Sequence, residues 1–120
     1  YALVIAKFLS QRALGEPMTI TGDGTQTRDF THVRDIVRAN ILAARSSKVG
    51  KGEVINIGAG NNASVVRIAE LVGGPVEHAA ARLEPHDTLA DNTLAKELLG
   101  WEPSVSLEDG IAELKQEFYL

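Results

Sequence analysis

Apolar residues recur along this chain at helical spacing, and short β-prone runs and glycine turns separate the helical stretches. The pattern predicts helices over residues 3–14, 33–44, 65–71, 92–99 and 107–118. Short strands are expected over residues 18–21, 30–33, 54–57 and 75–78. We therefore expect a mixed, helix-rich α/β fold with about five helices, and the few strands cannot make a complete Rossmann fold.

One face of the helix expected over 33–44 is strongly apolar. Its members follow the spacing i, i+3, i+4, i+7, i+8, i+11, and they are Val33, Ile36, Val37, Asn40, Ile41 and Ala44. We expect this face to be core. Asn40 falls on it, and a satisfied buried amide is the preferred interpretation over a ligand contact.

A glycine turn precedes an arginine on a braced backbone. Gly22-Asp-Gly24 is a turn signal, because glycine reaches positive φ without a steric clash. Arg28 stands between this turn and the strand expected over 30–33. Its guanidinium, a rigid fork of five donors, suits a bidentate grip on phosphate oxygens. The alternative is a surface ion pair with Asp29 or Asp23.

Residues 58–63 fit a dinucleotide-binding fingerprint, Gly-x-Gly-x-x-Ala between a strand and a helix, with Glu77 near the expected acidic spacing. A cofactor fold needs several further βα units after that turn, and too little chain remains here. We favour a tight structural turn in which Asn62 or Ser64 caps the next helix.

Three further features are interpreted as structural. His86 lies between Glu84 and Asp87, but one loop without a second cluster makes a poor metal site. Trp101 is expected to fill the core between helices. Residues 106–109 resemble a capping box, and the last helix carries an apolar stripe that is core or a docking face. The stripe consists of Leu107, Ile111, Leu114 and Phe118.

Composition narrows the function. At 120 residues and 44% hydrophobic, without internal repeats, the chain is expected to form one domain over residues 1–120. A net charge of −4 argues against a nucleic-acid or anionic-membrane surface. Without cysteine, a cytoplasmic enzyme is the default, and no apolar run approaches a membrane span. The start at Tyr1 suggests a fragment of a larger protein.

The spaced pattern Gly22-Asp-Gly, Arg28-Asp-Phe30, Val33 and Asp35 resembles the carboxy-terminal half of the nucleotide-sugar epimerases and dehydratases, the extended short-chain dehydrogenases. Further landmarks lie before this pattern at residues 4–8 and after it at residues 56–58 and 90–103, so the resemblance spans nearly the whole chain. It implies a substrate-binding domain whose NAD-binding Rossmann domain lies amino-terminal to Tyr1. It also implies a homodimer for the full-length enzyme.

The resemblance assigns substrate contacts by position. Arg28 matches the arginine on the diphosphate, and Phe30 matches the aromatic position beside the base, with core packing as the alternative. Val4 matches an apolar contact near the uridine. Thr19 and Thr21 match the strand whose backbone reads the base edge. At the second diphosphate clamp, Glu84 replaces the family arginine.

The departure at Glu84 affects the rest of that loop. A carboxylate facing a diphosphate would be repelled, so we expect Glu84 to turn outward. Asp87 keeps the place of the ribose contact. Arg82 is the nearest arginine that could serve as the second clamp.

Catalytic residues are not recognised in this chain. The family relays a proton through a Tyr-x-x-x-Lys pair next to the nicotinamide, whereas the two tyrosines here are Tyr1, followed at the fourth position by Ile5, and Tyr119 near the end. We expect no catalytic, cofactor-binding or metal-binding residue, and no activity from the chain alone.

Three classes of function stay open. The first is the nucleotide-sugar-binding part of an NAD-dependent epimerase of the UDP-glucose 4-epimerase type, with a 4,6-dehydratase or UDP-glucuronate decarboxylase as close variants. The second is a small-molecule binding module without catalysis. The third is an interaction domain that uses the stripe of the last helix.

Overall fold

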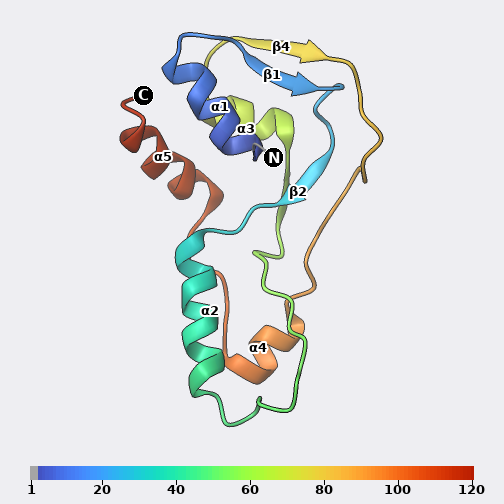
Figure 1. The fold of residues 1–120 in the computed structure, drawn as a ribbon, viewed down its shortest axis with the longest axis vertical. Helices are drawn as coiled ribbons and strands as arrows, with labels where there is room; N and C mark the ends of the chain where they lie inside the picture. The colour runs from blue at the N-terminus through green and yellow to red at the C-terminus, as the bar shows by residue number, and fades with distance from the viewer. Residues whose placement is uncertain (1–2) are drawn as a thin grey trace. The chain divides into compact units, whose positions relative to one another are not determined.

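The computed structural model describes residues 3–120, so Tyr1 lies outside the described part (Figure 1). It confirms the helix-rich α/β class, with five helices and four short strands among these residues. In chain order they are α1 Val4–Ala13, β1 Met18–Thr21, β2 Thr27–Asp29, α2 Val33–Arg45, β3 Asn62–Ser64, α3 Val65–Val72, β4 Val76–Ala79, α4 Thr93–Leu99 and α5 Leu107–Glu117. No helix in this range is both long and apolar enough to cross a membrane.

The chain forms two compact units. Unit 1 comprises the described residues up to Arg28, Ala63–Asp87 and Glu108–Leu120, and unit 2 comprises Asp29–Asn62 and Thr88–Leu107. The expectation of a single domain over residues 1–120 stays a prediction.

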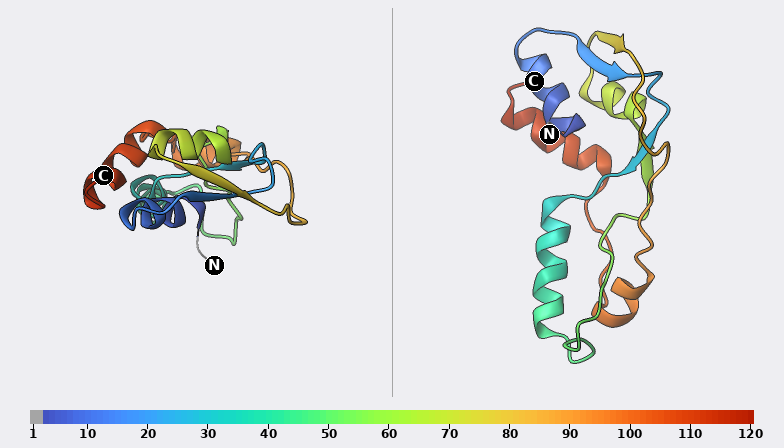
Figure 2. Two further views of the ribbon diagram at one scale, coloured as in Figure 1. Left: turned by 90° about the horizontal axis from the view of Figure 1, so that it is seen from above. Right: turned by 45° about the vertical axis from the view of Figure 1, so that its right-hand side comes forward.

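In unit 1, β1 and β4 form a parallel pair with Met18 opposite Val76 and Thr21 opposite Ala79. Helices α1 and α3 pack against each other and against β1 (Figure 2). Apolar side chains from these elements and from α5 are buried: Phe8, Leu9, Met18, Ile20, Val65, Ile68, Ala69, Val72 and Ile111. Removing this surface from water supplies the main stabilisation of the unit.

The glycine turn after β1 has the conformation that the sequence predicts. Gly22 and Gly24 have φ values of 69° and 79°. Gly24 is also buried, and a Cβ there would lie 2.7 Å from a Val66 methyl carbon and 2.8 Å from an Ile20 methyl carbon. The Gly24 carbonyl accepts a hydrogen bond from the Val66 amide at 3.0 Å, which ties the turn to the start of α3.

The prediction of a strand over 30–33 is wrong. The strand, β2, begins three residues earlier, covers Thr27–Asp29 and pairs with β3. Val33 begins α2 instead. The His32 side chain accepts a hydrogen bond from the Arg34 amide at 3.1 Å and so acts as the N-cap of α2. This capping commits the segment to the helix start.

The strand expected over 54–57 is also not formed in the described structure. Ile55 and Ile57 pack on the core of unit 2, whereas Val54 is 85% exposed. The alternation of a strand is therefore present. A ladder of hydrogen bonds requires a neighbouring strand, and the described residues provide none at this position.

Trp101 fills the core of unit 2 between α2 and α4, as predicted. It is buried with Ala39, Ala95 and Leu99, and its indole N–H donates to the Asp35 carbonyl at 2.8 Å. α4 ends at Gly100, whose φ of 63° is left-handed. The sequence predicts this stop as well.

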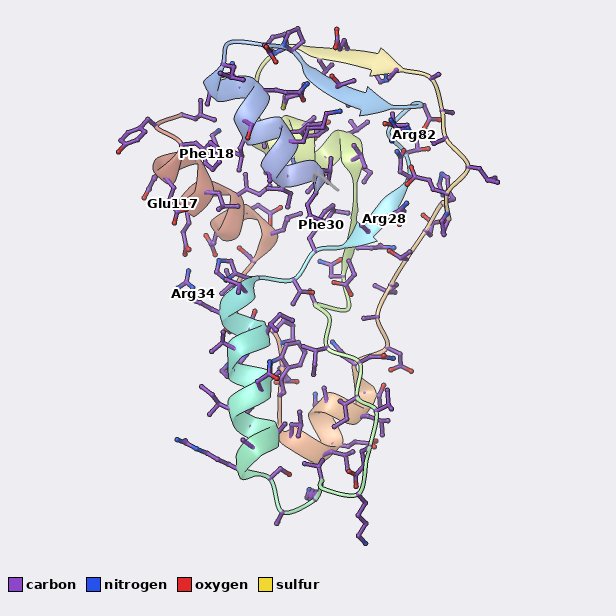
Figure 3. All side chains as sticks on the ribbon, in the orientation of Figure 1. Arg28, Phe30, Arg34, Arg82, Glu117 and Phe118 are labelled. Carbon is purple, nitrogen blue, oxygen red and sulfur yellow. The ribbon has the colours of Figure 1, made fainter. Side chains whose placement is uncertain are left out.

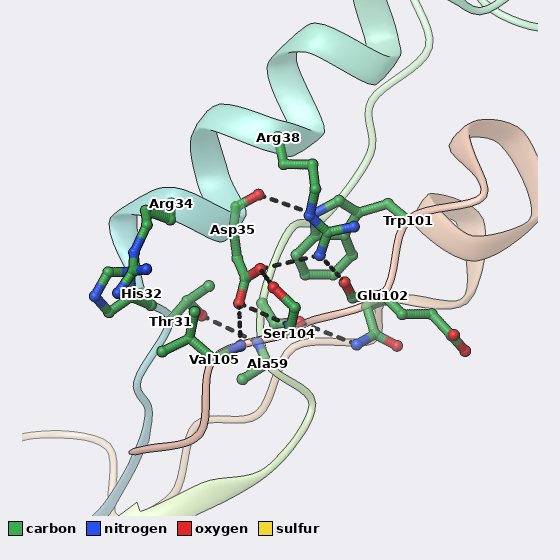
Figure 4. A network of polar contacts seen from close by, with 12 residues as sticks. Thr31, His32, Arg34, Asp35, Arg38, Ala59, Trp101, Glu102, Ser104 and Val105 are labelled. Atoms are coloured by element: carbon green, nitrogen blue, oxygen red, sulfur yellow. Dashed lines mark hydrogen bonds and ion pairs between the residues drawn. The ribbon is translucent and has the colours of Figure 1, made fainter. Parts of the chain in front are cut away.

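A buried carboxylate connects α2 to the segment after Trp101. Asp35 is 1% exposed, and it accepts hydrogen bonds from the Ser104 amide, the Ser104 hydroxyl and the Val105 amide at 2.9, 2.6 and 3.1 Å. Arg38 donates to it at 2.9 Å and also contacts the Glu102 carbonyl (Figure 4). Burial raises the pKa of Asp35, but the bonds from Ser104, Arg38 and Val105 outweigh burial and hold the pKa well below its ordinary value.

The prediction that the apolar face of α2 is its core side is wrong. Val33, Val37 and Ile41 are 67%, 52% and 47% exposed. Asn40 is exposed too, and its side-chain Nδ2 donates to the Ile36 carbonyl at 2.9 Å. The helix instead buries the face that carries Asp35 and Ala39, because small side chains and a bonded carboxylate allow the close approach of Trp101.

We predict that Gly24→Ala lowers the free energy of unfolding by about 2–4 kcal/mol, because it combines a left-handed φ with overpacking. Urea denaturation followed by circular dichroism measures the change. Gly15→Ala is the matched control, since Gly15 has φ +74° and no atom within 4 Å of an added Cβ. Equal losses in the two variants would contradict the contact with Val66 and Ile20.

We predict that Asp35→Asn lowers the free energy of unfolding at pH 7 by about 1–3 kcal/mol, because the amide keeps only one of the two acceptor oxygens and loses the charge. A folded pKa below the unfolded value near 4 stabilises the protein above that pH, and this stabilisation is lost as the pH falls below it. The gap between wild type and variant should therefore shrink at pH 3.

Denaturant unfolding at both pH values tests this prediction, with Glu97→Gln, an exposed acid on α4, as the control. A gap of the same size at pH 3 and pH 7 would refute the role assigned to the charge.

Candidate functional site

Arg28 lies in the middle of β2 and is held by its own chain. Its side chain is 26% exposed. One terminal nitrogen donates to the carbonyls of Thr27 and His86 at 2.6 and 3.1 Å. The other donates to Glu84 at 2.8 Å. A guanidinium fixed by two carbonyls is preorganised for an anion, because little freedom is left to lose on binding.

The expectation that Glu84 turns outward is wrong for the structure described here. Its carboxylate faces Arg28 in an ion pair and also accepts a hydrogen bond from the side-chain amide of Gln26 at 3.3 Å. Without another anion at Arg28, attraction to the guanidinium decides the direction of Glu84. Arg28 therefore has an ion-pair partner, but the partner is neither Asp29 nor Asp23.

Residues 84–87 run alongside residues 25–28 and are tied to them at several points. The Thr27 amide donates to the His86 carbonyl at 2.8 Å, and the Thr27 hydroxyl donates to Asp87 at 2.7 Å. His86 and Asp87 form an exposed pair with 2.9 Å between Nδ1 and Oδ2. The bond from His86 lowers the pKa of Asp87, and the bond to Asp87 raises the pKa of His86. Arg28 and Asp87, both expected at the site, thus lie on adjoining segments of unit 1.

The free edge of β1 presents Thr19 and Thr21. Met18 and Gly22 donate their amides to Pro75 and Ala79, on the β4 side. Since backbone groups alternate along a strand, those of Thr19 and Thr21 point to the other edge. At that edge, side chains of the same unit occupy several of these backbone groups.

Two of these side chains come from α1. Gln11 accepts from the Thr19 amide at 3.0 Å and donates to the Thr19 hydroxyl at 2.8 Å. Lys7 donates to the Thr19 carbonyl at 3.4 Å. Sequence reasoning missed Gln11 and Lys7. Their i, i+4 spacing on one helix face is the signal that could have found them.

The Thr21 carbonyl accepts a hydrogen bond from the side-chain amide of Gln26 at 2.9 Å. Because the same amide also reaches Glu84, Gln26 connects the edge of β1 with the ion pair at Arg28.

The remaining expected site residues have no hydrogen bond to this cluster. Val4 is the first residue of α1 and is half-buried. Arg82 is exposed on the segment after β4, whereas Arg28 projects from β2 (Figure 3). Phe30 is half-buried and belongs to unit 2. The substrate contacts assigned to these residues stay predictions.

The glycine turn at residues 58–60 already holds a carboxylate. The amides of Ala59, Gly60 and Ala90 donate to Asp29 at 2.9, 2.9 and 3.1 Å. A Cβ at Gly58 would lie 2.9 Å from an Asp29 oxygen. The amides that a pyrophosphate would need are thus occupied, so the residues present do not fit a dinucleotide. Ser64 caps α3 by accepting from the Arg67 amide at 3.1 Å, one of the two caps that the sequence predicts.

Metal ligands do not gather in the described part of the chain. Within residues 3–120 there is no group of three or more His, Asp or Glu side chains placed to hold an ion.

Comparison with known proteins identifies the family. The family model described as GDP-mannose 4,6 dehydratase matches residues 2–114. The chain therefore belongs to the nucleotide-sugar epimerase and dehydratase family of the extended short-chain dehydrogenases.

Individual relatives agree with this assignment. The chain is 34% identical to UDP-glucuronic acid decarboxylase 2 of Arabidopsis thaliana, over 96% of this chain and 27% of that protein. UDP-glucose 4-epimerase from Thermotoga maritima, solved with UDP-glucose, is 39% identical with a TM-score of 0.84, and 98% of this chain covers 39% of it.

A third relative was solved with both ligands. UDP-glucuronic acid 4-epimerase from Bacillus cereus, in complex with UDP-glucuronic acid and NAD, is 34% identical with a TM-score of 0.85, over 98% of this chain and 40% of that one. The chain thus spans between about a quarter and two fifths of the length of these relatives.

Proposed function

We propose that this chain is the nucleotide-sugar-binding part of an NAD-dependent nucleoside-diphosphate-sugar 4-epimerase of the UDP-glucose type. Its own task is to hold the nucleotide diphosphate. The redox chemistry belongs to a cofactor-binding part of the full-length protein. On this proposal the chain alone is inactive, and the full-length protein is a cytoplasmic homodimer.

The observation that carries the proposal is the preorganised guanidinium of Arg28. Two carbonyls fix one of its terminal nitrogens, and the other terminal nitrogen faces the half-exposed acid Glu84. A diphosphate needs a permanently charged, planar donor of this kind. The Thermotoga maritima relative, which was solved with UDP-glucose, matches 98% of this chain.

The edge of β1 supports a base-binding role beside Arg28. Thr19 and Thr21 present alternate backbone groups there, and Gln11 occupies part of the edge with an amide. An amide carries a donor and an acceptor, as the edge of uracil does, so this strand edge can satisfy a pyrimidine in the same way.

Unit 2 supports the expected link to a cofactor domain. Val33, Val37 and Ile41 form an exposed apolar stripe on α2, and residues 54–57 are extended without a neighbouring strand in the described chain. Both features suit a unit that completes its core and its sheet with another part of the same protein. NAD would be held by that part, because Asp29 occupies the fingerprint-like turn at residues 58–60.

A second candidate is a UDP-glucuronate decarboxylase. It is favoured by the match to the Arabidopsis thaliana decarboxylases, which are 31–34% identical to this chain. The residues that would separate oxidation followed by epimerisation from oxidation followed by loss of carboxylate are not recognised in this chain.

We predict that the full-length protein, supplied with NAD, interconverts UDP-glucose and UDP-galactose and releases no CO₂ from UDP-glucuronate. Chromatography of the nucleotide sugars and a CO₂ assay measure the two activities. Decarboxylation without interconversion would select the second candidate. Binding of UDP without turnover of any of the three sugars would leave a binding module as the correct class.

We predict that Arg28→Ala in the full-length protein raises KM for the nucleotide sugar by roughly ten- to a hundredfold, with a smaller effect on kcat. A charge-assisted bond is typically worth about 1.5–3 kcal/mol, and the diphosphate is held both before and during reaction. Steady-state kinetics with UDP-glucose provide the measurement.

Arg67→Ala is the matched control for Arg28→Ala. Arg67 is an arginine of the same unit, paired on the surface with Glu70 and Glu108. Its loss should leave KM unchanged. An unchanged KM in Arg28→Ala would remove Arg28 from the site.

A further inference from the structure

Glu84 occupies a terminal nitrogen of Arg28 that the proposed function assigns to the diphosphate. One of its oxygens lies 2.8 Å from Nη2 of Arg28, and the other accepts from Gln26 at 3.3 Å. Nη1 of the same guanidinium is engaged by the carbonyls of Thr27 and His86. A phosphate oxygen approaching Nη2 therefore meets a like charge at the same place.

The segment that carries Glu84 is tied to β2 by bonds that do not involve the Glu84 side chain. Thr27 binds both the carbonyl of His86 and the carboxylate of Asp87, so the backbone beside Arg28 is held independently of Glu84. The Glu84 side chain is 40% exposed and has solvent to turn into. Displacing it requires a change of rotamer and leaves the carbonyls on Nη1 in place.

We propose that Glu84 is an internal competitor for the diphosphate at Arg28 and thereby sets the affinity for the nucleotide sugar. In the free protein its carboxylate occupies the guanidinium, and on binding it turns out to solvent. This inference rests on the proposed function, since it takes the ligand to be a nucleoside diphosphate.

The balance of charges allows a diphosphate to make the exchange. An exposed ion pair is weak, so a dianionic diphosphate that offers several oxygens can replace a single carboxylate. A weaker anion gains less from Arg28 and meets the same competitor. The exchange also explains how an acid can stand at a position where family members place a second cationic clamp. An acid at this position is compatible with diphosphate binding only if its carboxylate can turn away from Arg28.

The test is the affinity of the full-length protein for UDP, measured by isothermal titration calorimetry. Glu84→Gln keeps the size of the side chain and removes its charge, so we expect the Kd for UDP to fall about two- to fivefold, the range typical of an exposed ion pair. Glu84→Ala should give a fall in the same direction. For inorganic phosphate, which meets the same competitor, we expect a fall in Kd of similar relative size.

Glu70→Gln is the matched control. Glu70 is likewise an exposed acid paired with an arginine of unit 1, at 3.4 Å from Arg67. It removes the same charge from the protein, so an unchanged Kd separates local competition from a change in net charge. Thermal unfolding of each variant verifies that it is folded.

Arg28→Ala separates the two proposals. A weaker affinity in Arg28→Ala together with an equal or weaker affinity in Glu84→Gln would overturn the role of Glu84 and leave the proposed function standing. Unchanged affinity in Arg28→Ala would remove Arg28 from the site and overturn the role of Glu84, and no binding of UDP by the wild type would overturn both proposals. A comparable gain in Glu70→Gln would attribute the effect to net charge and would also overturn the role of Glu84.

Discussion

The Asp29 carboxylate fixes the end of the strand that carries Arg28. Three backbone amides from two distant segments, at Ala59, Gly60 and Ala90, donate to it within 3.1 Å. Charge-assisted bonds to backbone amides are strong and directional, so this one side chain joins β2 to a glycine turn and to the approach to α4. Gly58 has to be glycine because a Cβ there would lie 2.3 Å from the Ala90 Cβ and 2.9 Å from an oxygen of this carboxylate.

The motif from Gly22 to Asp35 divides its tasks between structure and binding. The glycines form a turn that packs under α3, and the two acids at positions 29 and 35 satisfy backbone amides far away in the sequence. Arg28 is the member of the motif whose charged side chain is partly exposed to solvent. A motif of this kind identifies a family strongly because most of its residues are required by the fold, and only a few are free to meet a ligand.

Sequence reasoning failed where burial depends on tertiary packing. The strong apolar stripe of α2 is exposed at Val33 and Val37, while the helix buries Ala39 and Asp35. Periodicity finds an apolar face, but it cannot tell which neighbour covers it. Glu84 is a similar case, because its direction depends on whether its cationic neighbour holds another anion.

Local chemistry was readable from the sequence by itself. The five helices, the glycine stop of α4, the Ser64 cap and the buried Trp101 follow from spacing, capping preference and side-chain size, which act within a few residues. The family also follows from residues alone. Only the tertiary structure placed Gln11 on the edge of β1, Asp29 in the glycine turn and Glu84 on Arg28. Those contacts join residues brought together by packing, and no local preference encodes which charge or amide will meet which.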